Sequence, residues 1–178
     1  QEEKSQIELV SRKNSILASA ENFGFDVASI ININETKNLE VELRQFLEKE
    51  HHGEMEWLDK KQEFRSDPKK LWKEAKSVIV LGSNYHFETN SLDLLNQKNK
   101  GIISVYARSR DYHLSIKKKL KAFSKWISDN YQCQIKFFVD TAPVMEKPLA
   151  MQAGIGWQGK HTNLVSKEYG SWLFLSSI

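Results

Sequence analysis

Apolar residues recur along the chain at two spacings, and the alternation of these spacings predicts alternating helices and strands. Residues 5–23 carry an apolar stripe at helical spacing that ends at Gly24, a residue suited to a helix end. Residues 25–33 alternate between apolar and polar positions, which predicts a strand with one buried face. The chain is therefore expected to open with a helix and a first sheet strand.

The next stretch predicts short helices. Residues 38–59 have apolar positions at helical spacing and are expected to form a helical hairpin, with Gly53 between its two helices. Pro68 follows a capping Asp67 and predicts a short helix over residues 68–72. Arg65, which precedes this turn, is expected on a connecting loop.

Residues 77–85 form a nearly continuous apolar run, as expected for a central strand that is covered on both faces. Residues 86–101 have no periodic pattern and predict a surface loop, and residues 102–107 predict a short strand. Residues 116–127 then carry an apolar stripe and predict an amphipathic helix.

The last part of the chain predicts a strand, a helix and a hairpin. The strand covers residues 134–140, the helix residues 145–153, and the hairpin pairs residues 162–166 with residues 170–178. The sequence therefore predicts an α/β (α+β) fold, in which a mixed central sheet lies between layers of helices.

Composition limits the class of protein. The 178 residues are 40% hydrophobic and carry a net charge of +3, which favours one soluble domain over residues 1–178. The longest apolar runs are far shorter than the ~20 residues of a membrane-spanning helix, and no secretory signal is visible, so we expect a cytoplasmic location and no membrane partner. Cys133 is the single cysteine, which leaves no set of thiolates for a metal or an iron–sulfur cluster.

Asp140 is the strongest candidate for chemistry. It ends an apolar run, so its carboxylate is expected at the mouth of a strand, where it could transfer a proton to a bound substrate. The alternative is that Asp140 only caps the helix after Pro143. A single acid without a paired carboxylate argues against a glycosidase.

Glycines at 154, 156 and 159 match the dinucleotide-binding pattern G-x-G-x-x-G, and residues 160–163 add a run of hydrogen-bonding side chains. A helix precedes this stretch and a strand follows it, which is the reverse of the order in a dinucleotide site. The glycines are expected either to let the backbone approach a bulky ligand or only to form tight turns.

Two further groups of charged residues allow two interpretations each. Residues 108–113 bring arginines, Asp111 and His113 to a helix start, which fits anion recognition or a capped helix with solvated arginines. Three lysines form one face of the 116–127 helix, which fits a solvated surface or a contact with RNA phosphates. His51 and His52 lack further ligands, and no metal site is predicted there.

Four ordered segments resemble the amino-terminal half of the epoxyqueuosine reductase family, cobalamin-dependent enzymes that modify tRNA and are related to reductive dehalogenases. The segments are SVIVLGSNY, YARSRDYH, VDTAPVMEKPLAMQAGIGWQGKHTNLVS and EYGSWLFLSSI. The resemblance covers most of the chain from about Phe64 onward, and the helix and strand at residues 5–33 also fit it.

The resemblance implies a nitroreductase-like cobalamin-binding scaffold and the reduction of epoxyqueuosine to queuosine in the tRNA anticodon loop. It implies that cobalamin and two 4Fe-4S clusters serve the full-length enzymes and that Asp140 donates the proton. The cobalamin-binding residues that it implies are Arg65, Ser104, Asp140, Lys160, Leu164 and Leu175.

The chain departs from the family at several positions. Ser109 stands where the family usually has Gly, and His161 where it often has Asn. The cysteine-rich segment and the helical repeats of the family are missing, so the chain is expected to be a monomeric fragment that is incomplete for turnover, with its electron donor and the axial ligand of cobalt undetermined. The alternatives are a non-catalytic corrinoid-binding module and a flavin- or nicotinamide-dependent reductase on a similar scaffold.

Overall fold

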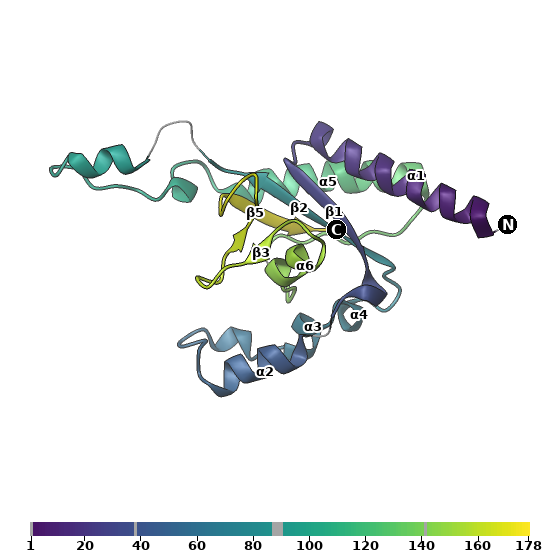
Figure 1. Ribbon diagram of the computed structural model, residues 1–178, viewed down its shortest axis with the longest axis horizontal. Helices are drawn as coiled ribbons and strands as arrows, with labels where there is room; N and C mark the ends of the chain where they lie inside the picture. Colours follow the sequence, from purple (N-terminus) through teal and green to yellow (C-terminus); the bar gives the residue numbers. More distant parts are fainter. Residues whose placement is uncertain (1, 38, 87–90, 141) are drawn as a thin grey trace.

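The computed structural model describes residues 2–37, 39–86, 91–140 and 142–178, which form helices and strands (Figure 1). In chain order they are α1 (Glu2–Ala20), β1 (Val27–Asn32), α2 (Glu40–Glu48), α3 (Gln62–Ser66), α4 (Pro68–Leu71), β2 (Ser77–Asn84), α5 (Tyr112–Tyr131), α6 (Glu146–Gln152), β3 (Trp157–Gln158), β4 (Leu164–Val165) and β5 (Leu173–Ser177). Short 3₁₀ helices are η1 (Glu21–Phe23), η2 (Ile33–Glu35), η3 (Glu56–Leu58), η4 (Ser91–Asn96) and η5 (Val105–Ala107). Among the described helices, none has the length and apolar character needed to cross a membrane.

The first helix and strand are confirmed. α1 continues into η1, and Gly24 ends the helical segment with φ 82, donating its N–H to the Glu21 carbonyl. Gly24 adopts this left-handed conformation without the steric cost that a side chain would add. The chain then enters β1 within three residues, so the apolar face of the helix and that of the strand stay together.

The main sheet has the strand order β1-β2-β5, and β2 is central, as its continuous apolar run predicts. β1 pairs with β2 in antiparallel register, with Val27 opposite Gly82, and β5 pairs antiparallel on the other side, with Ser177 opposite Val80. The expected mixed sheet was wrong for the described residues, where the named strands pair antiparallel throughout. Helices α2–α4 form the connection between β1 and β2. The chain enters β2 at the end of the sheet where β1 stops, and β2 therefore runs antiparallel to β1.

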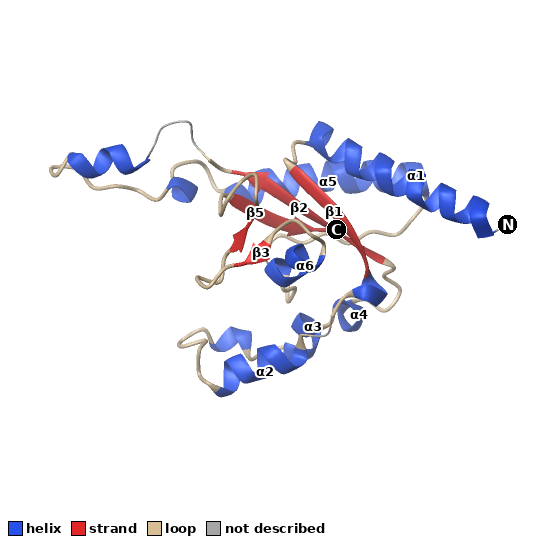
Figure 2. Ribbon diagram, in the orientation of Figure 1, coloured by secondary structure: helices blue, strands red, loops and turns tan. Residues whose placement is uncertain are grey.

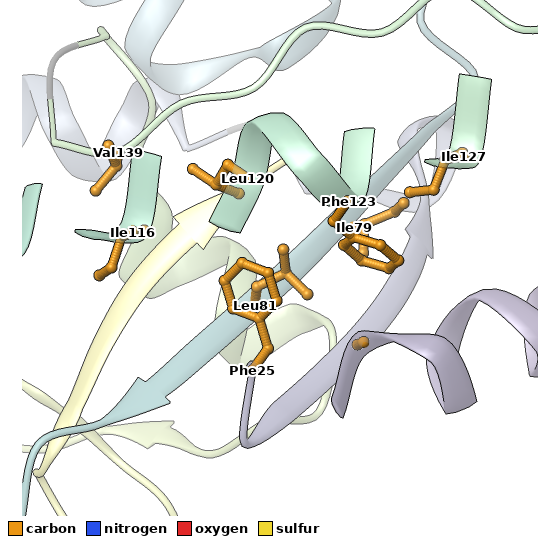
Figure 3. Close-up of a cluster of buried hydrophobic side chains, with 9 residues drawn as sticks. Phe25, Ile79, Leu81, Ile116, Leu120, Phe123, Ile127 and Val139 are labelled. Carbon is orange, nitrogen blue, oxygen red and sulfur yellow. The ribbon is translucent and has the colours of Figure 1, made fainter. Parts of the chain in front are cut away.

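Helices cover both faces of this sheet (Figure 2). On one face Ile79 and Leu81 pack against α1 and α5, in the cluster that Figure 3 shows. On the other face Val78 and Val80 pack against α6. Since alternate residues of β2 contact opposite layers, the molecule has three layers, and the predicted α/β class is confirmed.

α5 supplies most of the first layer because its apolar residues recur at helical spacing. Asp111 caps its start, where its side chain accepts from the His113 N–H at 2.9 Å. Full burial of a Leu or Phe side chain contributes about 2 kcal/mol. The apolar residues of α5 buried in this core are Ile116, Leu120, Phe123 and Ile127.

Three predicted loops and strands differ from the structure. Arg65 lies in α3 rather than on a connecting loop, because the residues around it close a single helical turn after Lys61. η4 forms inside the expected 86–101 loop, of which residues 87–90 lie outside the described residues. The expected strand at 102–107 contains η5 instead, since no neighbouring strand pairs with it.

The last predicted strands differ in their partners. Residues 134–140 make a single bridge between Phe138 and Ser177 instead of a full strand. β4 pairs with β3 rather than with β5, and only the Ser166–Gly170 bridge remains of the predicted hairpin. The reason is competition: β2 offers β5 a longer partner, with five paired residues from Leu173 to Ser177.

Candidate active site

Asp140 emerges directly from the buried core. Its neighbour Val139 is 4% exposed, whereas the Asp140 side chain is 42% exposed. Asp140 also has φ 51, a left-handed conformation that costs a non-glycine residue roughly 1 kcal/mol. The backbone therefore turns sharply after Val139 and presents the carboxylate to solvent beside the edge strand β5.

The start of α5 holds this carboxylate. Tyr112 donates its hydroxyl to Asp140 Oδ2, and His113 Nε2 lies 3.3 Å from the same oxygen. The other ring nitrogen, His113 Nδ1, lies 2.7 Å from Asp111 Oδ1. Hydrogen bonds from the side chain and the backbone of His113 lower the pKa of Asp111. Burial, followed by the contact with Asp140, raises the pKa of Tyr112. Tyr112 therefore stays a hydrogen-bond donor.

Glu146 completes the group from the first turn of α6. Burial and then the negative charge of Asp140 raise the pKa of Glu146 to about 8, and its carboxyl is hydrogen-bonded to the side chain of Asp140. We call Asp111, Tyr112, His113, Asp140 and Glu146 the acid cluster. Asp140 thus has a carboxyl partner, contrary to the sequence-based expectation of a lone acid.

Stacked aromatic rings fix the acid cluster against the sheet. The Tyr112 ring lies 3.9 Å from that of Phe174 on β5, with 8° between the planes, and 4.1 Å from that of His113. Tyr85 stacks on Phe174 at 4.3 Å and donates its hydroxyl to the Ser171 carbonyl at 3.0 Å. The stack holds the Tyr112 hydroxyl in place without help from a ligand.

The glycine loop, residues 154–163, connects α6 to β4 through β3. Its order, helix and then strand, confirms that the glycine pattern is not a dinucleotide site. A Cβ at Gly156 would lie 2.2 Å from the Val165 carbonyl oxygen, and one at Gly159 would lie 2.6 Å from the His161 ring. Gly156 is therefore required by the close packing of the loop against the Val165 backbone, whereas the exposed His161 ring could move away from a side chain at position 159.

The structure brings two of the predicted pocket residues together. Leu164 is 5% exposed in the cluster beneath α6, and Leu175 of β5 packs against that cluster. Lys160 is exposed in the glycine loop, ahead of both leucines in sequence. Lys147 of α6 donates to Asn163 Oδ1 at 3.2 Å, which ties the loop to the helix that carries Glu146.

Arg65 and Ser104 make their described contacts elsewhere. Arg65 donates to the Trp57 carbonyl at 3.2 Å and stacks over the Trp57 ring at 4.9 Å, and burial lowers its pKa. Ser104 is exposed and accepts from the Ala107 N–H at 2.9 Å. Figure 1 places α2 and α3 below the sheet, apart from α5. The assignment of both residues to the site stays a prediction.

One cavity formed by the described residues lies away from the acid cluster. This cavity of about 530 Å³ is lined mainly by apolar residues of α1, α4, β2 and the 133–138 segment, and it includes Ile178. Asp140, Lys160, Leu164 and Leu175 do not line it. Because Asp140 lies in a sheet-edge surface with exposed polar groups on either side, the candidate site is open rather than enclosed. Among the described residues, no group of three or more His, Cys, Asp or Glu side chains is arranged to hold a metal ion.

Sequence reasoning found Asp140 but missed the contribution of Glu146 and of Tyr112. The signal for Tyr112 was its place directly after the predicted N-cap Asp111, because side chains in the first turn of a helix can contact the segment on which that end of the helix packs. Glu146 carried no signal except its place at the start of a predicted helix. The site therefore consists of two carboxyls, a tyrosine and a histidine at the sheet edge of a three-layer α/β domain, which are side chains that can exchange protons.

Comparisons with known proteins show what the chain is similar to. Residues 65–141, which include Tyr112, His113 and Asp140, match the family model described as epoxyqueuosine reductase QueG, DUF1730. The chain is 37% identical over 161 residues to the epoxyqueuosine reductase of Cyclobacterium marinum, covering 90% of this chain and 51% of that protein. It is 38% identical over 149 residues to that of Synechocystis sp., covering 82% and 50% respectively. The chain is thus related to the epoxyqueuosine reductases, as its motifs predicted, and it spans about half the length of these curated relatives.

Solved structures agree on the fold. The epoxyqueuosine reductase of Streptococcus thermophilus superimposes with a TM-score of 0.78 at 29% identity, covering 93% of this chain and 44% of that one. An epoxyqueuosine reductase solved with an epoxyqueuosine-modified tRNA stem loop has a TM-score of 0.74 at 22% identity, covering 94% of this chain and 44% of that one. The three-layer arrangement is therefore shared with these enzymes.

Proposed function

We propose that this chain is the cobalamin-binding catalytic part of an epoxyqueuosine reductase, which reduces epoxyqueuosine in a tRNA anticodon loop to queuosine. The observation that carries the proposal is the acid cluster, because it lies largely within the matched residues 65–141 and contains a carboxylate that is both held in place and open to solvent. We treat residues 1–178 as a single domain acting as a monomer in the cytoplasm. Since the relatives are about twice as long, the activity of a whole enzyme is part of the proposal.

The residues of the chain suit the proton chemistry of this reaction. Conversion of an epoxide to an alkene and water consumes two electrons and two protons, and the oxygen leaves more easily when it is protonated. Asp140 gives the proton to that oxygen. Tyr112 and His113 both face Asp140 Oδ2, so they hold the carboxyl in one orientation while its exposed part faces the substrate.

The predicted pocket offers groups that fit cobalamin. Amide arms and a phosphate need donors, and the glycine loop exposes the ammonium group of Lys160 together with polar neighbours. Leu164 and Leu175 would lie beneath the ring through packing or main-chain contacts, and Arg65 and Ser104 would complete the pocket if α3 and η5 close toward the sheet edge. When bound, cobalamin supplies the reducing electrons.

Electron supply and tRNA binding need more than these residues. Cys133 is the single cysteine of the chain, so the 4Fe-4S clusters proposed for the full-length enzymes belong to the part of the relatives that the chain does not cover. One relative of the same fold was solved with a tRNA stem loop. Three lysines of α5 form an exposed basic surface that supports tRNA as the partner: Lys117, Lys121 and Lys125.

Absorbance spectra test the cofactor first. Mixing the 178-residue chain with cob(II)alamin, FMN or NADH should perturb only the cobalamin spectrum. A response to FMN or NADH alone would support a flavin- or nicotinamide-dependent reductase instead.

Turnover then tests the reaction. Cobalamin-loaded chain is incubated with an epoxyqueuosine-containing tRNA stem loop and dithionite, which replaces the missing electron supply, and the loss of one oxygen is followed by mass spectrometry. Asp140→Asn should lower the rate about 100-fold while cobalamin binding persists. Wild-type turnover by Asp140→Asn rejects the acid, and cobalamin binding without turnover by the unmodified chain indicates a corrinoid-binding module.

A further inference from the structure

The proposed reaction leaves open where the proton resides before Asp140 delivers it. Asp140 Oδ2 accepts from the Tyr112 hydroxyl, and the Asp140 side chain is also hydrogen-bonded to the Glu146 carboxyl. Two carboxyl groups share a hydrogen bond only when one of them carries a proton. The pair therefore stores one proton.

The surroundings favour Glu146 as the group that carries it. Glu146 is mostly enclosed at the start of α6, and its Oε1 is buried without a hydrogen-bond partner among the described residues. A buried oxygen without a hydrogen bond costs far less free energy when it belongs to a neutral carboxylic acid than when it belongs to a carboxylate. Asp140, with 42% of its side chain exposed and the Tyr112 hydroxyl donating to it, is better suited to the negative charge.

The other charged groups nearby do not supply Glu146 with a counter-charge. Asp140, from the 139–140 turn, is the titratable group that acts on Glu146, and its negative charge raises the cost of a second one. Tyr112 of α5 keeps its proton and adds no charge. His113 faces Asp140 Oδ2 rather than Glu146. Lys147, the next residue of α6, is exposed and directed to Asn163.

We propose that Glu146 is a positioning residue that stores the proton which Asp140 delivers, so that the two carboxyls act as one donor pair. This inference rests on the proposed function. As Asp140 protonates the departing oxygen, the Glu146 O–H proton passes to Asp140, and Glu146 is left as a carboxylate. Solvent reprotonates the pair through the exposed side of Asp140 and so supplies the second proton of water, while the electrons come from the reduced cofactor.

Carbon-13 NMR of the side-chain carboxyls tests the storage without any reaction. In the 178-residue chain the resonance that disappears in Glu146→Gln is that of Glu146, and its titration midpoint is expected near pH 8. Asp140→Asn should lower this midpoint, because the adjacent negative charge is lost. A midpoint near the ordinary glutamate value of about 4.3 overturns the proposal.

The pH profile of turnover tests the delivery. With the tRNA stem loop and dithionite, the rate of the unmodified chain should fall above about pH 8. Glu146→Gln keeps the size of the side chain but has no transferable acid proton, so its rate should be at least roughly tenfold lower at pH 7 and should no longer change near pH 8. The matched control is Glu48→Gln, at the exposed end of α2, which should behave as the unmodified chain does.

The outcomes separate the two proposals. A Glu146→Gln variant that folds, as judged by its thermal midpoint, and retains the rate and pH profile of the unmodified chain overturns the proton store. An unmodified chain without turnover at any pH overturns the proposed function instead, and the NMR midpoint then decides alone whether Glu146 holds a proton.

Discussion

The acid cluster and the glycine loop differ in how firmly the protein holds them. In the acid cluster, the Asp140 carboxylate is contacted by Tyr112, His113 and Glu146, and the stack on Phe174 fixes the tyrosine. In the glycine loop, the backbone is tightly packed but Lys160 points to solvent. The difference teaches that the fold itself fixes the side chains of the acid cluster, whereas it leaves the Lys160 side chain free to adapt.

The largest expected effect comes from the buried acid of the acid cluster. The pKa of Glu146 is raised above its unfolded value to about 8, so its neutral form stabilises the fold fully below about pH 4.5, and that stability is lost as the pH rises through 8. The loss should be roughly 3 kcal/mol, since one pKa unit corresponds to about 1.4 kcal/mol and the coupled pair shares the effect. Urea unfolding between pH 5 and pH 9 measures it.

Glu146→Gln should remove most of this pH dependence, because glutamine stays neutral. The variant should match the unmodified chain near pH 5 and exceed it in stability at pH 9. Glu48→Gln should leave the slope intact. If the free energy of unfolding depends on pH equally in the unmodified chain and in Glu146→Gln, the fold does not raise the pKa of Glu146.

The next effect concerns the packing of the glycine loop. Gly156→Ala places a Cβ 2.2 Å from the Val165 carbonyl oxygen, and the loop must move to relieve it. Overpacking of this kind costs about 2 kcal/mol, and the displaced loop should also weaken cobalamin binding. Urea unfolding and absorbance titration measure the two losses. Gly101→Ala is the control, because its Cβ would meet no atom within 4 Å; equal stability of the two variants would contradict the packing argument.

A third prediction separates the acid contact from the aromatic stack. Tyr112→Phe keeps the stack on Phe174 but removes the hydroxyl that donates to Asp140, which should cost about 1.5 kcal/mol and lower turnover roughly tenfold. Tyr85→Phe is the matched control on the other side of Phe174, since its hydroxyl donates to the Ser171 carbonyl instead. Tyr85→Phe should lose about 1 kcal/mol of stability without a change in turnover. If both variants lose turnover equally, the Tyr112 hydroxyl has no specific role through its contact with Asp140.

The sequence predicted the residues whose signals are local. The cap at Asp111 and the glycine after α1 each depend on neighbours within a few positions, and the structure agrees with them. The central place of β2 followed from its continuous apolar run. These features are fixed by local propensity and burial, which a single sequence displays.

The features that the sequence did not predict depend on partners. The apolar alternation of β5 is the same whether it pairs with β4 or with β2, so the strand pattern could not choose between them. The pairing of Glu146 with Asp140 depends on a turn that brings two helix starts together. Arg65 looked like a loop residue because a single-turn helix has too few residues to show periodicity.

The smallest expected effect is at the exposed side chain of the glycine loop. Lys160→Ala removes one solvent-exposed charge, and such a charge contributes under about 1 kcal/mol to binding an anionic group. Cobalamin affinity should fall about threefold at low salt, and the difference from the unmodified chain should shrink as salt screens the phosphate. Absorbance titration at two ionic strengths measures this, with Lys167→Ala as the control on the neighbouring turn. If Lys160→Ala abolished binding at both ionic strengths, the lysine would be held by the fold as firmly as Asp140, and the contrast between an acid cluster set in advance and an adaptable loop would fail.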